Sequence, residues 1–499
     1  MRAKIIALLF IIALGLILRL HLLLNGYIGF AQPDNYIYYS VAQYALTHHW
    51  VLGSNLSGFP NHNFYTEKPL LIYQIFLLYP ITHSIYASML ILPLLYSVLL
   101  LIFLYLFAEE LGVGTNLSLL ASFLGAVVVA SLNVTSAMQY RGGSFVPILL
   151  LVAIYFLAKI NSNKGRVQAY YMLISAMLLA IMLFLWNGAL YVVPIYLIGA
   201  LLMLFGANKL HGHTAISLTI IILLAGIILV LSPVGIKYLG SITPIDSYTA
   251  TIAELQAPTL NTYLVDFGLL PLIALIGIVV LWFKKQITAA EIGLLVMFMG
   301  TFPLALLAQR WASLFYIPLI LMSVYGLAAI SRKPQFKAIY ILIILAVALS
   351  SSLLAVAYFV QLAPDTSARV GAYISWIDAN TPQNATFLTL WQDGSIIEGW
   401  ANRQSYTDSV IGQNSTRIYQ FSHFLFAKAW NLTYLTQVRP DYLVIHHYWL
   451  NYTAGIAMEG NLPPNINING TNFEALENGS IDLPIVYKSA NTIIYKIYT

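Results

Sequence analysis

The sequence contains no cysteine and very little charge. Without Cys, the chain can form neither a disulfide framework nor a thiolate metal site. Charged residues make up 8% of its 499 residues, against about 25% in soluble domains, while 60% are hydrophobic and the mean hydropathy is +0.80. A water-soluble globule is therefore excluded. The net charge of +5 is divided among short Lys and Arg clusters and forms no basic stripe, so we expect no nucleic-acid partner.

Apolar runs long enough to cross a membrane recur along the first 362 residues. Hydrocarbon about 30 Å thick needs roughly 20 apolar residues in a helix. The sequence therefore predicts a multi-pass α-helical membrane protein with about 11–13 transmembrane helices. The clearest runs lie near 4–24, 86–107, 117–134, 144–160, 169–186, 188–206, 214–234, 266–283, 289–308, 312–331 and 337–361.

Basic residues indicate which helix ends face the cytoplasm, because Lys and Arg gather on that side of a membrane. Here they follow alternate spans, at Arg2 and Lys4, Lys159 with Lys164 and Arg166, Lys209, Lys284 with Lys285, and Arg332 with Lys333 and Lys337. We therefore expect a protein of the cell membrane with a cytoplasmic N-terminus. Its outer segments would be 25–85, 135–143 and 235–265, together with everything after residue 362.

The tail differs in composition from the rest of the chain. It is rich in Asn, Tyr and Thr, opens with a helix-like stretch from Ala368 to Asp378, and continues with a β-branched and aromatic run from Ala385 to Leu390. Two further strand-like runs, 484–488 and 492–498, close the chain. We predict a transmembrane domain over 1–362 and an extracytoplasmic domain of mixed α/β structure over 363–499.

Three short motifs carry the polar groups of interest. Gln32-Pro33-Asp34 sets a carboxylate at the outer mouth of the first helix, and Thr251-Ile252-Ala253-Glu254 sets another in the third outer loop. In the tail, Leu390-Trp391-Gln392-Asp393-Gly394 follows an Asn380-Thr381-Pro382 turn and precedes Arg403 and Asp408. Taken singly, a loop carboxylate is usually just solvated, and Trp391 is as readily a core residue as a functional one.

In this order, the segments resemble the catalytic subunit of oligosaccharyltransferase, of the archaeal and bacterial single-subunit type, which is a GT-C glycosyltransferase. The resemblance runs over nearly the whole chain. Its most specific element is the stretch from Thr251 to Glu254, which matches the family's Thr-Ile-x-Glu motif, followed by the tail segment, which matches a Trp-Trp-Asp-Tyr-Gly motif. Asp34 falls where the family has its first-loop metal ligand.

The chain also departs from the family pattern. The family carries two acidic residues in the second outer loop, where this chain has Val146 and Ile148. In the tail motif the aligned Asp is Gln392, and Asp393 stands one place late. Because the family reads the acceptor sequon with that motif, these changes bear on both metal binding and acceptor choice.

The resemblance implies a reaction that these residue types can support. An Asn amide is a poor nucleophile because its nitrogen lone pair is delocalised into the carbonyl. Two carboxylates that accept hydrogen bonds from the amide could weaken this conjugation, and Asp34 and Glu254 are the candidates, as catalytic groups and as ligands of Mn²⁺ or Mg²⁺. Arg310 matches an Arg that contacts lipid phosphate. Trp391, Gln392, Asp393 and Thr251 would contact the acceptor.

Plainer interpretations stand beside these. Arg310 can serve only to reach the membrane interface, and Arg19 and Arg141 are more readily explained as such snorkelling residues or as loop anchors. His48, His49 and His62 share the first outer loop, where solvated or capping roles are favoured over metal binding. Glu109, Glu110 and Glu291 lie at cytoplasmic helix ends and receive no role.

The sequence thus predicts transfer of a glycan from a polyprenyl (dolichyl) phosphate-linked oligosaccharide to Asn of Asn-x-Ser/Thr in an acceptor protein or peptide, at the outer face of the membrane. Two alternatives remain open. One is a catalytically diverged paralogue that acts as an accessory or binding protein in the lipid membrane. The other is a related lipid-dependent glycosyltransferase with a different acceptor. A transporter is the weakest alternative, because we see no sign in the sequence of broken helices in paired halves.

Overall fold

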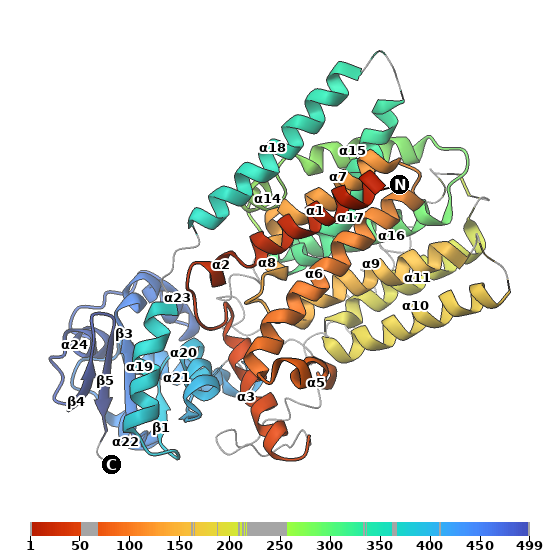
Figure 1. Ribbon diagram of the computed structural model, residues 1–499. Helices are drawn as coiled ribbons and strands as arrows, with labels where there is room; N and C mark the ends of the chain where they lie inside the picture. Colours follow the sequence, from red (N-terminus) through yellow and green to blue (C-terminus); the bar gives the residue numbers. More distant parts are fainter. Residues whose placement is uncertain are drawn as a thin grey trace, which may run out of the picture.

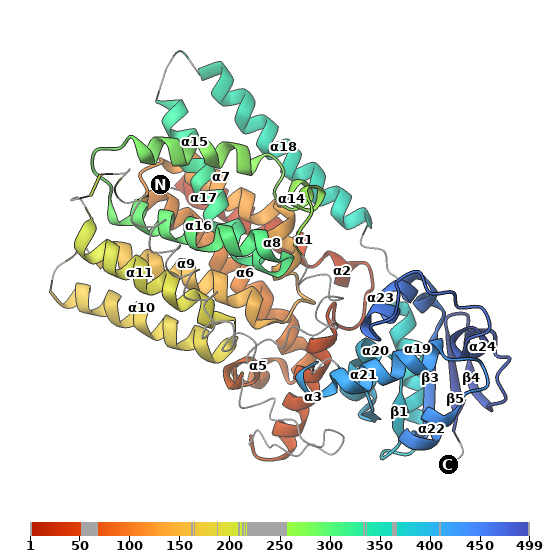
Figure 2. The ribbon, with the colours of Figure 1, turned by 180° about the vertical axis from the view of Figure 1, so that it is seen from behind.

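The computed structural model shows a bundle of long helices with a smaller α/β part at one end (Figures 1 and 2). It describes residues 2–497 except 51–67, 217–256 and 362–366, with short gaps at 161–162, 164, 187, 208–209, 212–213, 215, 333–334, 336 and 409–410. The predicted domain boundary between 362 and 363 falls in one of these gaps and stays a prediction.

The bundle consists of apolar helices. Among the described residues, six helices are long and apolar enough to cross a membrane, or up to eight if each of two bent pairs is one span. The predicted run near 214–234 lies almost wholly outside the described residues. The bundle helices are α1 (Arg2–Arg19), α6 (Ile85–Glu110), α7 (Thr115–Val127), α8 (Val129–Thr135), α9 (Gly142–Ile160), α10 (Arg166–Leu185), α11 (Ala189–Gly206), α14 (Leu260–Phe267), α15 (Leu270–Trp282), α16 (Ala289–Leu307), α17 (Ala312–Ser331) and α18 (Lys337–Gln361).

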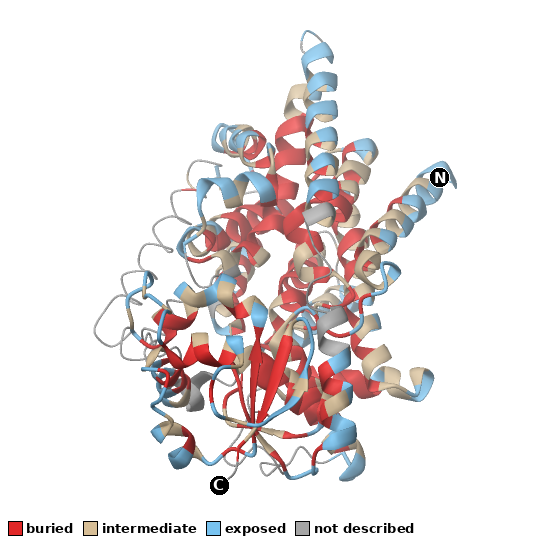
Figure 3. Cartoon of the chain, turned by 90° about the vertical axis from the view of Figure 1, so that its left-hand side faces the viewer, coloured by how far each residue is buried: buried red, intermediate tan, exposed pale blue. Residues whose placement is uncertain are grey.

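Burial separates a central group of helices from a peripheral one. Helices α9, α16 and α17 are mostly buried, and they carry the apolar core of the bundle. Helices α10 and α18 are mostly exposed although they are equally apolar. Figure 3 shows the contrast between buried and exposed segments. An apolar helix surface of this extent fits contact with lipid and does not fit contact with water.

Two of the predicted spans are bent in the structure. Helices α7 and α8 meet at an angle of 60°, and α14 and α15 meet at 82°. At the first bend, the guanidinium of Arg19 donates hydrogen bonds to the carbonyl oxygens of Gly125 (3.0 Å) and Ala126 (3.2 Å) and to the hydroxyls of Ser131 and Thr135 (both 2.7 Å). Arg19 is only 1% exposed, so of the two roles expected for it, snorkelling and loop anchoring, snorkelling is wrong. Its charge instead satisfies carbonyls at the negative end of α7.

The outer segment after α1 folds into helices α2 (His21–Leu24), α3 (Pro33–Thr47) and α5 (Pro69–Thr82). Helix α3 begins with proline at its first position, where the missing N–H costs no hydrogen bond. Asn35 is fully buried, and its side-chain amide donates to the Met138 carbonyl at 2.9 Å. The Ala31 amide donates to the same oxygen at 3.2 Å, so the first outer segment is fixed to the second.

A five-stranded mixed sheet organises the C-terminal part, in the order β2-β1-β3-β5-β4. Strand β1 (Thr386–Leu388) pairs in parallel with β2 (Gln404–Ser405) and with β3 (Tyr442–His446). Strand β5 (Thr492–Lys496) pairs antiparallel with β3 and with β4 (Ile485–Lys488). The strands predicted near 385–390, 484–488 and 492–498 are therefore present.

Helices cover both faces of this sheet, because side chains alternate along a strand. Leu443 and Ile445 of β3 face one apolar cluster, while Tyr442 and Val444 face the other. The covering and connecting elements are α19 (Ser367–Asn380), α20 (Trp391–Ile396), the π-helical turn η5 (Ile397–Ala401), α21 (Ile411–Phe426), α22 (Thr433–Val438), η6 (His447–Tyr452), α23 (Thr453–Glu459) and α24 (Asn472–Asn478). The helix predicted from Ala368 to Asp378 is α19.

Candidate active site

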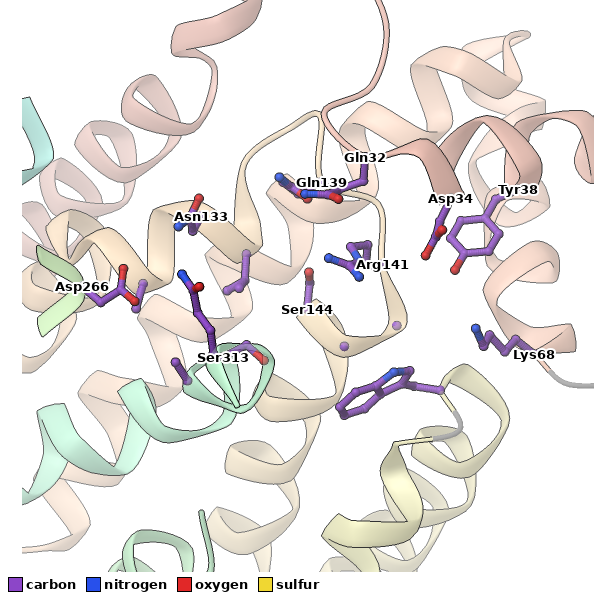
Figure 4. A pocket seen from close by; sticks show the side chains of 17 residues that line it. Gln32, Asp34, Tyr38, Lys68, Asn133, Gln139, Arg141, Ser144, Asp266 and Ser313 are labelled. Carbon is purple, nitrogen blue, oxygen red and sulfur yellow. The ribbon is translucent and has the colours of Figure 1, made fainter. Parts of the chain in front are cut away.

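A polar pocket of about 300 Å³ lies among the outer segments and the ends of the bundle helices. Most of its lining side chains are polar or charged, and they come from parts of the chain that are far apart in the sequence: Gln32, Asp34, Tyr38, Lys68, Asn133, Gln139, Arg141, Ser144, Asp266, Gln309 and Ser313. Figure 4 shows Asp34 and Asp266 on opposite sides of this pocket, with Arg141 between them. The sequence prediction of a site at Asp34 thus falls on the wall of a cavity.

Asp34 is positioned by the start of α3. It stands in the first turn of the helix, where the free backbone N–H groups favour a negative charge. It is half-buried, and its neighbour Asn35 anchors the turn to Met138. The carboxylate is therefore held on the pocket wall, close to the second outer segment.

The second outer segment contributes a cation and a close backbone contact. Arg141 lines the pocket, and α9 begins directly after it at Gly142. A Cβ at Gly142 would lie 2.2 Å from the Leu185 carbonyl oxygen, so only glycine fits there. Val146 and Ile148, where the family has acidic residues, are fully buried in the apolar core. Neither position supplies a charge to the pocket.

Two lining residues received no role from the sequence. Asp266 is mostly buried near the end of α14, and Lys68 stands directly before α5. Asp266 is the first residue of the predicted span 266–283, and carboxylates within transmembrane segments are functional candidates by default. That signal was available in the sequence. Lys68 follows Glu67 in a long polar loop and carried no such signal.

Some of the predicted site residues lie outside the described part of the chain. Thr251 and Glu254 belong to the gap 217–256. Arg310 stands in the turn η3 (Gln309–Trp311), whose Gln309 lines the pocket, but its side chain is not described. Within the described ranges, no group of three or more His, Asp and Glu could hold a metal ion. The shared metal site of Asp34 and Glu254 stays a prediction.

The tail motif forms the first turn of α20. Trp391 and Gln392 are half-exposed, whereas Asp393 is buried. The Tyr448 hydroxyl donates to the Asp393 carboxylate at 2.8 Å, and the Trp449 indole N–H donates to it at 3.0 Å. His446 Nε2 lies 3.5 Å from the same carboxylate. The structure thus turns Asp393 toward the domain interior, and its contact with an acceptor stays a prediction.

The residues that follow the motif contact neighbouring elements of the domain. Arg403 donates to the carbonyl oxygens of Thr381 and Asp378, both at 3.0 Å, and so caps the C-terminal end of α19. Asp408 is buried beside Glu398. Burial, together with the charge of Asp408, raises the pKa of Glu398 well above its ordinary value. In the structure, these contacts of Arg403 and Asp408 are therefore within the C-terminal domain.

The C-terminal part docks directly on the helix that carries Asp34. Trp400 of η5 stacks on Tyr39 of α3, with ring centroids 5.9 Å apart and an interplanar angle of 23°. A Cβ at Gly399 would lie 2.4 Å from the Tyr36 carbonyl oxygen, so the two backbones are in close contact. Helix α20 also packs on α3, as Figure 1 shows. The tail motif and the polar pocket are therefore linked through α3.

Comparison with known proteins bears on the fold. No protein-family model and no curated protein matches the chain. It is similar to the oligosaccharyltransferase AglB from Archaeoglobus fulgidus in complex with an inhibitory peptide and a dolichol-phosphate, at a TM-score of 0.71 and 14% identity over 92% of this chain and 71% of that one. An Archaeoglobus fulgidus oligosaccharyltransferase in complex with Zn and sulfate matches at a TM-score of 0.68, with 16% identity over 92% of this chain and 70% of that one.

A second kind of enzyme shares the architecture more distantly. ArnT from Cupriavidus metallidurans, bound to undecaprenyl phosphate, matches at a TM-score of 0.54 and 9% identity over 99% of this chain and 97% of that one. The predicted fold class is confirmed, and the resemblance to oligosaccharyltransferase is confirmed at the level of the fold. The chain has the fold of the archaeal oligosaccharyltransferases, a GT-C membrane glycosyltransferase fold with a C-terminal domain of mixed α/β structure.

Proposed function

We propose that the chain is a membrane glycosyltransferase of the oligosaccharyltransferase type. It would transfer a glycan from a polyprenyl (dolichyl) phosphate-linked oligosaccharide to the Asn of Asn-x-Ser/Thr in an acceptor protein or peptide. The observation that carries the proposal is the polar pocket. Asp34 lines this pocket from α3, and the tail motif packs on the same helix. Structures with this fold hold a dolichol-phosphate and a peptide, or an undecaprenyl phosphate.

The donor phosphate would be bound by the cations of the pocket. Lys68 and Arg141 both line it, and Arg310 stands in the adjoining turn. Positive side chains of this kind stabilise the charge that develops on a leaving phosphate. Arginine can contact two phosphate oxygens at once, which also fixes their orientation.

Carboxylates would activate the acceptor amide. Asp34 and the predicted Glu254 would accept hydrogen bonds from the Asn NH₂ and weaken its conjugation. Asp34 and Asp266 offer oxygen atoms in the same pocket, the ligand type that Mn²⁺ and Mg²⁺ prefer. Asp34 and Glu254 would hold such an ion, which would stabilise negative charge on the phosphate. No other step depends on it.

The acceptor would approach along α20. Trp391 and Gln392 are half-exposed at its start and can pack on a peptide or accept a hydrogen bond from the sequon hydroxyl, and Thr251 belongs to the same predicted contact set. We place this side of the protein outside the cell, with the N-terminus in the cytoplasm. A cysteine introduced at the exposed Ser480 should then react with an impermeant reagent in intact cells, and protection would contradict this orientation.

A transferase with another acceptor is the second candidate. Val146 and Ile148 are buried where the family has acidic residues, which bears on metal binding. Asp393, in the motif with which the family reads the sequon, points inward, which bears on acceptor choice. A panel of peptides separates the two candidates. Transfer to Asn-x-Thr but not to Gln-x-Thr supports the first, whereas transfer to a Ser or Thr hydroxyl supports the second. Binding of donor and peptide without any transfer would identify a diverged paralogue.

A further inference from the structure

Glu459 is a buried carboxyl group that directly contacts the tail motif. It is the last residue of α23 and is 8% exposed. The indole N–H of Trp391 donates a hydrogen bond to its Oε1 at 3.0 Å, across 68 positions of sequence. Its other oxygen, Oε2, is buried and has no hydrogen-bond partner among the described residues. Trp391 is therefore held from the side of the domain interior while part of its ring stays exposed.

A carboxyl group is an unfavourable choice at this position unless it serves a purpose. The C-terminal end of a helix carries partial negative charge, and burial removes the water that would stabilise an ionised group. Burial raises the pKa of Glu459 to about 7, while the Trp391 hydrogen bond acts in the opposite direction. A leucine or methionine would fill the same space without this cost. What leucine or methionine could not provide here is an acceptor for the Trp391 indole N–H.

The surrounding titratable groups are engaged elsewhere. Elements α21 and η6 pack on α23, and Trp391 belongs to α20. His423 of α21 contacts the Gly460 carbonyl oxygen at 2.8 Å. Within the described ranges, no other titratable group on these elements makes a hydrogen bond or ion pair with Glu459; those groups are Arg417, Tyr419, His447, Tyr448, Tyr452 and Asp393. The Glu459 proton therefore responds chiefly to burial and to Trp391.

We propose that Glu459 is a positioning residue for the acceptor peptide, which orients the Trp391 indole through their hydrogen bond. The inference rests on the proposed function, because it takes Trp391 as part of the acceptor surface. A hydrogen bond to an ionised carboxylate is stronger than one to a neutral acid. The Trp391 ring is therefore held more firmly when Glu459 is charged, and acceptor peptide binds more tightly above neutral pH than below it.

The first test follows the Trp391 ring itself in the full-length protein. The chain is labelled with 5-fluorotryptophan, and the Trp391 fluorine signal is identified by its loss in Trp391→Phe. In the wild type this signal should shift as the pH passes through neutrality, and the shift should vanish in Glu459→Gln. Glu477→Gln is the matched control, because Glu477 pairs with His447 instead, and it should leave the titration intact. A Trp391 signal that does not titrate in the wild type overturns the proposal.

The second test measures binding of a fluorescent Asn-x-Thr peptide without donor, so it does not depend on glycan transfer. We expect the wild type to bind more tightly at pH 8 than at pH 6, by up to about fivefold, because the difference between a charge-assisted and a neutral hydrogen bond sets the upper limit of what ordering Trp391 can contribute. Glu459→Gln, which keeps an acceptor oxygen, should bind weakly and equally at both pH values, and Glu459→Leu more weakly still. Equal affinity in all three proteins would refute the positioning role. Peptide binding that behaves as expected without any transfer would instead contradict the proposed function alone.

Discussion

Replacing Asp393 with alanine should destabilise the C-terminal domain strongly, because its carboxylate is the shared acceptor of two buried donors. The Tyr448 hydroxyl and the Trp449 indole N–H both point at it, and Trp449 is fully buried. A buried donor left without a partner costs about 1–3 kcal/mol, so two of them amount to roughly 2–6 kcal/mol of unfolding free energy. Asp393→Asn keeps an acceptor oxygen and should cost less.

The assay is urea or thermal unfolding of the full-length protein in detergent, followed by a probe in the C-terminal domain. Gln392→Ala is the matched control, because Gln392 is the half-exposed neighbour and should leave stability within about 0.5 kcal/mol of the wild type. A loss of stability in Asp393→Ala but not in Gln392→Ala would give Asp393 a structural role. If Asp393→Ala left stability unchanged but relaxed the preference for Asn-x-Thr over Asn-x-Ala, the inward orientation would be wrong and Asp393 would contact the acceptor after all.

Three further predictions concern other contacts. Arg19→Leu removes the donors at the α7–α8 bend and should lower the free energy of unfolding by about 2–5 kcal/mol, and with it the apparent melting temperature. The matched change at the exposed Arg332, Arg332→Leu, should alter the melting temperature little. Glu459 holds its proton up to about pH 7 in the folded protein but only to about pH 4.5 when unfolded, so its burial costs stability as the pH rises through this window. Glu459→Gln should therefore be the more stable protein at pH 8, by up to about 3 kcal/mol, and should lose that advantage at pH 4 in parallel melts. Gly399→Val should separate η5 from Tyr36, and a crosslinking yield across this contact equal to that of the wild type would contradict the close approach.

Much of the fold was readable from the sequence, because membrane spans and strands leave strong local signals. The apolar runs gave most of the bundle helices, and α19, β1, β4 and β5 lie where the sequence placed them. Strand β3 was missed, although the β-branched run Tyr442–His446 would have indicated it. The bend between α7 and α8 had no such local signal. The hydrogen bonds found there come from Arg19, more than a hundred residues away in the sequence.

The candidate site was predicted only in part for a similar reason. Asp34 could be found because it belongs to a local motif, and the structure places it on a pocket wall. The direction in which Asp393 points depends on Tyr448 and Trp449, which lie more than fifty residues further along the chain. No local pattern could have joined Trp391 to Glu459. Long-range contacts of this kind decide which polar residue faces a ligand and which supports the fold.

The central claim is that the pocket containing Asp34 performs glycan transfer to asparagine, and one measurement tests it most directly. Purified protein is incubated with a polyprenyl phosphate-linked oligosaccharide and an Asn-x-Thr peptide, and the product is located by mass spectrometry. The wild type and the exposed-site control Asp482→Asn should both attach the glycan to the Asn amide. Asp34→Asn should be slower by about 100-fold or more, the usual loss when a group that stabilises the transition state is removed. Transfer by Asp34→Asn at the wild-type rate, or no transfer by the wild type to any Asn-x-Thr peptide, would contradict the account.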